Sequence, residues 1–198
     1  MAPGSSTEGE SVLGSGLSPT DKARLTALAR ASIEHGLRAG KPLPVMVGEY
    51  PASLQAPGAA FVTLKRNDNL RGCIGSIAPV RPLVEDVANN AYAAAFEDPR
   101  FPPLRDAELA ELEIHISVLT PARPMQFTSQ NDLVRQLRPG VDGLILAEGS
   151  HRGTFLPSVW ESLPDPRDFL TQLKLKAGLP PHYWSATVTI QRYETEEW

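Results

Sequence analysis

The residue types best suited to chemistry lie in one short run, Leu70-Arg71-Gly72-Cys73-Ile74-Gly75, which holds the only cysteine of the 198 residues. On a β-strand, Arg71 and Cys73 project to the same side, because side chains alternate with a period of two. A guanidinium beside a thiol favours the thiolate, which is the nucleophilic form of cysteine. The pattern predicts a catalytic pair, with Cys73 as the reactive group and Arg71 as thiolate stabiliser or anion anchor.

Each of these residues also has a structural interpretation. A free cysteine is often a small hydrophobe in a core, and Arg71 could instead form an ion pair with Asp98 or Glu97. Two glycines, Gly72 and Gly75, would thin the backbone around the thiol and give a substrate access. The same glycines would equally suit close packing of a helix on a sheet. Their spacing is not that of a phosphate-binding P-loop or a dinucleotide fingerprint.

A second group of candidates follows in the segment Asp98-Pro99-Arg100-Phe101. Asp98 could act as an acid–base group, or it could end a helix and pair with Arg100 to hold the loop. We expect Asp98 and Arg100 to organise the substrate site together with the two glycines.

Other polar residues give weaker signals. Glu113, His115 and Ser117 share one face of a predicted strand, but neighbours at this spacing are roughly 7 Å apart. A hydrogen-bonded relay among them would therefore need help from another strand. Lys174 and Lys176 lie near the end of a predicted helix, where cations complement the helix dipole, and a ligand role for Lys176 is the less favoured alternative.

The elements that must position these residues can be read from the sequence pattern. A helix is expected to open at Ser18-Pro19 and to end at Gly40. A strand at 59–65, a turn at 67–69 and a strand at 70–77 form a hairpin that carries the cysteine. A helix then runs from Pro82 to the residue before Asp98, because a residue that precedes proline avoids the helical region.

The rest of the chain alternates between further strands and helices. Alternating patterns predict strands at 112–120, 142–147, 153–156 and 185–193, and helical patterns lie at 132–137 and after Asp165. Tight turns join several strand pairs, which favours an α+β fold: a single domain with a mixed, largely antiparallel sheet covered by helices. We assign residues 18–198 to this domain and residues 1–17, rich in serine and glycine, to a flexible tail.

Composition narrows the class of protein. Charged residues make up 21% of the chain and hydrophobic residues 41%, which is typical of a soluble globular protein. The net charge of −4 argues against a nucleic-acid partner, and the apolar runs are too short to span a membrane.

The N-terminus lacks the pattern of a signal peptide, and one cysteine cannot form an internal disulfide, so we expect a cytoplasmic protein. The sequence offers no zinc spacing and points to no cofactor.

Several ordered motifs resemble those of the AMMECR family, in particular its prokaryotic branch called AmmeMemoRadiSam system protein A. The motifs are Leu70–Gly75, Ala94–Leu104, Ile116–Pro121, Gly143–Leu146, Gly153–Trp160 and Lys176–Leu179. The resemblance implies an α+β fold with the cysteine motif beside a cleft, and it implies a Memo-type protein and a radical-SAM protein as partners. It specifies no reaction. The chain itself cannot hold a radical-SAM cluster, which needs several cysteines.

From these observations we predict an enzyme or enzyme component that works through a cleft around Arg71 and Cys73 and acts with the two implied partners. The alternative is a non-catalytic adaptor that docks a peptide or a partner protein in the same cleft.

Overall fold

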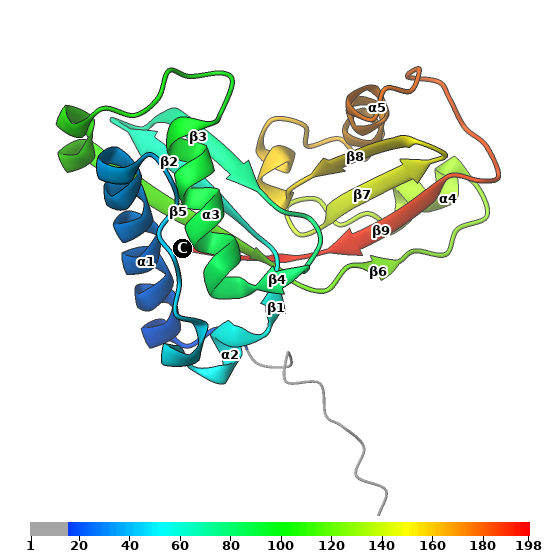
Figure 1. Cartoon of the computed structure of the whole chain (residues 1–198). Coiled ribbons are helices and arrows are strands. Elements are labelled where there is room, and N and C mark those ends of the chain that lie inside the picture. The colour runs from blue at the N-terminus through cyan, green and yellow to red at the C-terminus, as the bar shows by residue number, and fades with distance from the viewer. Residues whose placement is uncertain (1–15) are drawn as a thin grey trace, which may run out of the picture.

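The computed structural model describes residues 16–198, which form two lobes side by side (Figure 1). The first lobe holds a four-stranded sheet in the order β10-β5-β2-β3. Its strands are β2 (Ala60–Arg66), β3 (Asn69–Gly75), β5 (Leu112–Leu119) and β10 (Thr195–Glu197). A small two-stranded sheet, β1 (Pro57–Gly58) with β4 (Arg81–Pro82), lies at its lower edge.

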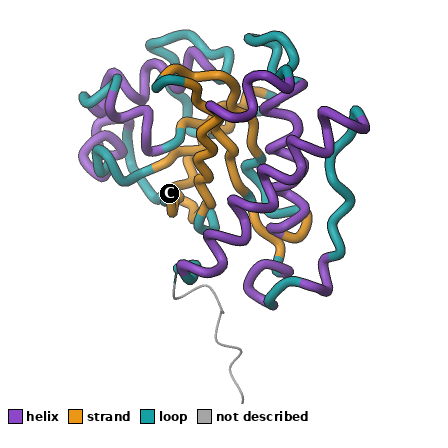
Figure 2. The backbone as a smooth tube through the Cα atoms, turned by 90° about the vertical axis from the view of Figure 1, so that its left-hand side faces the viewer, coloured by secondary structure: helices purple, strands orange, loops and turns teal. Residues whose placement is uncertain are grey.

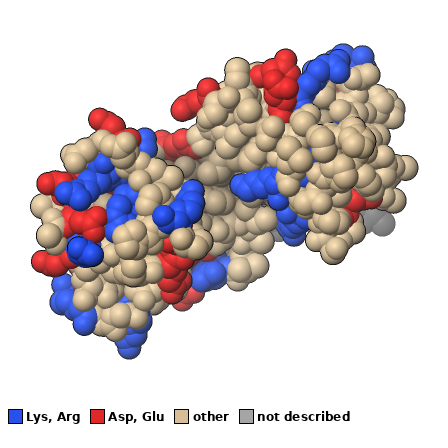
Figure 3. All heavy atoms as spheres, turned by 90° about the horizontal axis from the view of Figure 1, so that it is seen from above, with Lys and Arg blue, Asp and Glu red and all other residues tan. Residues whose placement is uncertain are grey.

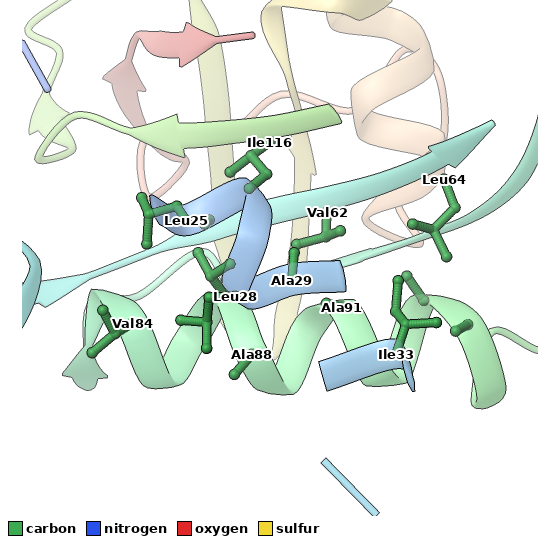
Figure 4. Close-up of a cluster of buried hydrophobic side chains, with 14 of the residues drawn as sticks. Leu25, Leu28, Ala29, Ile33, Val62, Leu64, Val84, Ala88, Ala91 and Ile116 are labelled. Carbon is green, nitrogen blue, oxygen red and sulfur yellow. The ribbon is translucent and has the colours of Figure 1, made fainter. Parts of the chain in front are cut away.

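Helices cover one face of the first sheet. Helix α1 (Pro19–Ala39) and helix α3 (Leu83–Phe96) pack on each other and on the strands, and their apolar side chains meet in one buried cluster (Figure 4). Val62, Leu64 and Ile116 contribute to this cluster from the sheet. The side chains that alternate with them therefore point to the opposite face of the sheet. The remaining elements of this lobe are η1 (Val47–Glu49), α2 (Ala52–Gln55) and η2 (Asp106–Glu111).

The second lobe has its own sheet and its own core. Its strands follow the order β6-β9-β7-β8, with bounds β6 (Arg123–Pro124), β7 (Gly143–Glu148), β8 (His151–Phe155) and β9 (Thr189–Tyr193). Its helices are α4 (Gln130–Gln136), η3 (Pro157–Glu161) and α5 (Pro166–Lys176). Figure 2 views the backbone from the side of the first lobe, with strands in the middle of the projected molecule and helices to both sides of them.

The chain passes between the two lobes in two adjacent connecting segments, which we call the crossings. One leaves β5 for β6, and the other leaves β9 for β10 through the single residue Glu194. The backbone N–H of Thr120 donates to the carbonyl oxygen of Glu194 at 2.9 Å, and the N–H of Glu194 donates to the hydroxyl of Thr120 at 2.9 Å. These bonds tie the crossings to each other and so fix how the second lobe sits beside the first.

Local signals explain where the main elements begin and end. Ser18 caps α1 by accepting a hydrogen bond from the N–H of Asp21 at 3.1 Å, and Gly40 ends it in the left-handed conformation. Asn67 and Asp68, with φ of 49° and 60°, form the tight turn between β2 and β3.

The α+β fold class is confirmed, and every strand pair among the described residues is antiparallel. The strands are distributed over three sheets rather than one. The sequence missed β10, which returns the chain to the first lobe.

Most of the predicted tail, residues 1–17, lies outside the described residues, but Leu17 packs against the core of the first lobe. Among residues 16–198, no helix has the length and apolar character to cross a membrane.

The close approach of α3 to β3 depends on Gly72. A Cβ atom built at Gly72 would overlap the carbonyl oxygen of Ala94, a backbone atom of α3 that has no freedom to move aside. This glycine therefore serves the packing of a helix on a sheet, which was one of its two sequence interpretations.

We predict that Gly72→Ala lowers the free energy of unfolding by about 2–3 kcal/mol, because the added methyl group separates α3 from the sheet. Gly48→Ala is the matched control, since a Cβ there meets nothing within 4 Å. The control should change stability by less than about 1 kcal/mol in the same urea titration. Equal stability of the two variants would contradict this role for Gly72.

Candidate functional site

The structure places Arg71 differently from the sequence prediction. The register of β2 and β3 pairs Leu64 with Gly72 and then Lys65 with Leu70, so Arg71 is the extra residue of a β-bulge. The simple alternation that put Arg71 beside Cys73 is broken at this point. The bulge therefore removes the alternation on which the predicted pairing of this guanidinium with the thiol was based.

The guanidinium of Arg71 instead forms an ion pair with Glu108. Its Nε donates to Glu108 Oε1 at 2.8 Å and its Nη2 donates to Oε2 at 3.2 Å, while Nη2 also donates to the carbonyl oxygen of Pro102 at 2.9 Å. These hydrogen bonds lower the pKa of Glu108 to about 2. Arg71 thus matches its ion-pair interpretation, with Glu108 as the acid in place of Asp98 or Glu97.

Cys73 is half-buried and lies on the sheet face opposite α1 and α3, because the neighbouring Gly72 faces α3. Its register partner on β2 is Thr63, whose Oγ1 donates a hydrogen bond to the Cys73 sulfur at 3.2 Å. His115 on β5 is the register partner of Thr63 on its other side. The three side chains form a row across the strands β3, β2 and β5.

Asp98 and Arg100 together bind both backbone polar groups of Cys73. Strand β3 is an edge strand, so one side of its backbone has no neighbouring strand. The N–H of Cys73 donates to Asp98 Oδ2 at 2.8 Å, and Nη2 of Arg100 donates to the Cys73 carbonyl oxygen at 3.2 Å. The two side chains also pair with each other through two hydrogen bonds of 2.9 and 2.7 Å.

Charge and burial strengthen this arrangement. Asp98 is only 5% exposed, and the hydrogen bonds from Arg100 hold the pKa of its carboxyl group well below the ordinary value. A carboxylate with a strongly lowered pKa is a poor general acid or base near neutral pH. The loop-holding interpretation of Asp98 therefore fits the geometry better than the acid–base interpretation.

Gly75 also serves packing rather than access. A Cβ atom at Gly75 would overlap the ring of Phe61, its register partner on β2. The ring of Phe61 thus occupies the space that a side chain at position 75 would need.

Lys176 is an exposed residue at the end of α5 in the second lobe. Its Nζ lies 5.0 Å from the centre of the Phe155 ring. Desolvation lowers the pKa of its ammonium group, and Cys73 acts in the opposite direction. Seen from above, the molecule has a hollowed waist between its two lobes (Figure 3).

The polar face of β5 does not form a hydrogen-bonded triad in the described residues. His115 Nε2 lies 3.8 Å from Glu113 Oε2 and has no hydrogen-bond partner there. Ser117 is nearly buried on the same strand. The described part of the chain also contains no group of three or more histidine, cysteine, aspartate or glutamate side chains that could hold a metal ion.

Sequence reasoning missed Thr63 and gave Lys176 little weight. The residue of β2 that faces Cys73 is found by counting residues along both strands from the turn at Asn67-Asp68. The count reaches Thr63 only when the bulge at Arg71 is included, and the sequence does not reveal that bulge. Lys176 belongs to a helix of the other lobe, and no local pattern shows that its side chain lies over Phe155.

Comparison with known proteins identifies relatives along most of the chain. The sequence profile of the AMMECR1 family matches residues 26–198. A protein of Methanothermobacter thermautotrophicus is 38% identical over 186 residues, which are 91% of this chain and 94% of the relative. A protein of Methanopyrus kandleri is 40% identical over 170 residues, covering 81% and 78% of the two chains. The crystal structure of the uncharacterised protein PH0010 from Pyrococcus horikoshii has 36% sequence identity, a TM-score of 0.80 and 88% coverage of each chain.

We predict that Asp98→Asn lowers the free energy of unfolding by about 2 kcal/mol at pH 7, because it weakens charge-assisted hydrogen bonds to Cys73 and Arg100. The pKa of Asp98 is lower in the folded state than the ordinary 3.8. Its stabilising contribution is therefore complete above that value and is lost as the pH falls below it.

The difference in unfolding free energy between wild type and Asp98→Asn should accordingly shrink below about pH 4, as measured by urea titrations across pH. Asp68→Asn, in the exposed turn before β3, serves as the control and should show little change at either pH. A difference for Asp98→Asn that stays constant from pH 7 to pH 3 would contradict the role of the carboxylate charge.

Proposed function

The chain belongs to the AMMECR1 family, and from that premise we propose that it is an enzyme or enzyme component whose reactive group is Cys73. The observation that carries the proposal is the hydrogen bond from Thr63 Oγ1 to the Cys73 sulfur at 3.2 Å, in a cysteine that is not sealed in the core. A structural cysteine needs no such donor, whereas a thiolate is stabilised by one.

The surroundings of Cys73 support nucleophilic chemistry. Asp98 and Arg100 fix its backbone, so the sulfur has a defined position. The guanidinium of Arg100 lies on the backbone of the same residue, where its Nη2 donates to the Cys73 carbonyl oxygen at 3.2 Å. In the proposed step, the sulfur donates an electron pair to an electrophilic carbon, and the leaving group departs with its bonding pair.

Residue roles are revised from those expected. Cys73 remains the proposed nucleophile. Arg100, which donates to the Cys73 carbonyl oxygen, replaces Arg71 as the proposed cation of the site, because Arg71 is bound to Glu108. Gly72 and Gly75 are assigned to packing, and Asp98 is assigned to positioning the backbone of Cys73.

We further propose the cytoplasm as the setting, because a reactive thiol stays reduced there. The AmmeMemoRadiSam branch, with a Memo-type protein and a radical-SAM protein as partners, remains a proposal that rests on the motifs at Leu70–Gly75 and Lys176–Leu179. Whatever a radical-SAM partner supplies, this chain would contribute the thiol and its charged neighbours.

We predict that Thr63→Val slows alkylation of Cys73 by iodoacetamide at pH 7 by about fivefold, because one hydrogen bond to the sulfur is lost. Cys73 is the only cysteine, so labelling of the folded protein followed by mass spectrometry reports on it alone. Thr189→Val, at an exposed position of β9, is the matched control and should react at the wild-type rate.

The adaptor alternative predicts a different result. If Cys73 is inert in the folded protein and labels only after denaturation, the proposed chemistry is excluded and the adaptor interpretation is favoured. Equal rates for wild type and Thr63→Val would exclude Thr63 as the residue that activates the thiol.

A further inference from the structure

We infer that Arg71 and Phe101 are positioning residues for the Cys73 thiol, on which they act through the loop that follows α3. This inference rests on the reactivity proposed for Cys73 and adds two residues that control how its sulfur is held. The loop spans residues 98–104, and we call it the strap.

The first argument is that the strap is bound to β3 at two places. Side chains at the start of the strap hold the N–H and the carbonyl oxygen of Cys73, at 2.8 and 3.2 Å. Two residues earlier on the same strand, Nη2 of Arg71 donates to the carbonyl oxygen of Pro102 at 2.9 Å. The side chain at position 71 therefore helps to determine where the strap lies on the edge of β3.

The second argument is that the guanidinium of Arg71 has a fixed position of its own. An extra residue in a strand re-aims its side chain, and Arg71 is the extra residue of the β-bulge. Its side chain is 11% exposed and binds Glu108 through hydrogen bonds of 2.8 and 3.2 Å. Glu108 belongs to η2, which lies beyond the strap. The guanidinium is thus held from outside the strap and can act as a support for it.

The third argument is that Phe101 joins two guanidinium groups. The centre of its ring lies 6.0 Å from Cζ of Arg71 and 5.5 Å from Cζ of Arg100. Both distances are within the range in which a cation is attracted to the face of an aromatic ring. Arg100 is therefore held by Asp98 on one side and by Phe101 on the other. A change at Arg71 reaches Cys73 through this ring.

The end of the strap is anchored independently of these contacts. Leu104 is buried in the core of the first lobe, and its N–H donates to the carbonyl oxygen of Ala95 at 2.8 Å. The N–H of Arg105, directly after the strap, donates to Glu108 Oε2 at 2.9 Å. Loss of the contacts made by Arg71 or Phe101 should therefore displace the middle of the strap and leave its end in place.

The charge of Arg71 explains why its action is indirect. Glu108 binds the guanidinium with both carboxylate oxygens, so the positive charge is balanced. A balanced guanidinium is a weak anchor for an anionic substrate, but its hydrogen bond to Pro102 is still directional. The contribution of Arg71 to the site is therefore geometric.

The experiment follows the amide proton of Cys73 by NMR in the full chain. A hydrogen bond to a carboxylate moves an amide proton to higher frequency, so this resonance reports the contact with Asp98 in the folded protein. Arg71→Met removes the guanidinium and keeps most of the side-chain volume, and Arg71→Lys keeps the charge. Asp98→Asn removes the carboxylate and defines the position of the resonance without it.

We expect Arg71→Met to move the Cys73 resonance part of the way to its position in Asp98→Asn, and Arg71→Lys to move it less. The double variant Arg71→Met/Asp98→Asn should match Asp98→Asn, because Arg71 acts only through the strap. Alkylation by iodoacetamide should slow by about threefold in Arg71→Met, which corresponds to the loss of one cation–aromatic contact. Arg152→Met, at an exposed position of β8, is the matched control and should change neither measurement.

Phe101→Leu is the second test, because it changes no residue of β3 and leaves the hydrogen bonds of Arg71 in place. It should move the Cys73 resonance in the same direction as Arg71→Met. It also decides the question if circular dichroism shows that the Arg71 variants are unfolded.

The outcomes separate this inference from the proposed function. A Cys73 resonance that keeps its wild-type position in Arg71→Met and in Phe101→Leu would overturn the inference. A double variant that moves the resonance beyond its position in Asp98→Asn would overturn it too, since Arg71 would then act independently of the strap. If the resonance moves as expected but iodoacetamide does not modify the folded protein, the positioning of Cys73 is supported and only the proposed reaction fails.

Discussion

The arrangement around Cys73 depends on one buried carboxylate. Asp98 accepts the backbone N–H of Cys73 with one oxygen, and both of its oxygens bind Arg100, which in turn donates to the carbonyl oxygen of Cys73. The pair of side chains thus takes the place of a neighbouring strand along the edge of β3. This contact closes the edge of β3 at one residue, fixes the sulfur beside Thr63, and holds the guanidinium of Arg100 on the Cys73 carbonyl oxygen.

The chain divides its polar groups between the two lobes. The first lobe holds Cys73 and the ion pair of Asp98 with Arg100, and the second lobe holds Lys176, whose Nζ lies 5.0 Å from the centre of the Phe155 ring. The paired crossings at Thr120 and Glu194 set the distance between the lobes. A change in the crossings would therefore alter how the second lobe sits beside the first.

Most of the fold could be predicted from the sequence, and the reason lies in local signals. The cap at Ser18, the turn at Asn67-Asp68 and the alternation of β5 each act within a few residues. The position of Arg71 could not be predicted, because a single inserted residue reverses the alternation and leaves no compositional trace. The pairing of β10 with β5 could not be predicted either, since it brings the end of the chain back to the first lobe from a strand of the second. The sequence identified Cys73, Asp98 and Arg100 as candidates, and it offered Asp98 or Glu97 as the acid that pairs with Arg71, where the structure has Glu108.

Amide hydrogen exchange of the Cys73 backbone N–H, followed by NMR, tests the central contact most directly. An outward-facing N–H on an edge strand normally exchanges rapidly, because nothing but water binds it. If Asp98 binds this group as described, its exchange should be as slow as that of amides in the central strand β2. Exchange at the rate of an unprotected edge amide in the native protein would show that Asp98 does not hold Cys73, and the account of the site would be wrong.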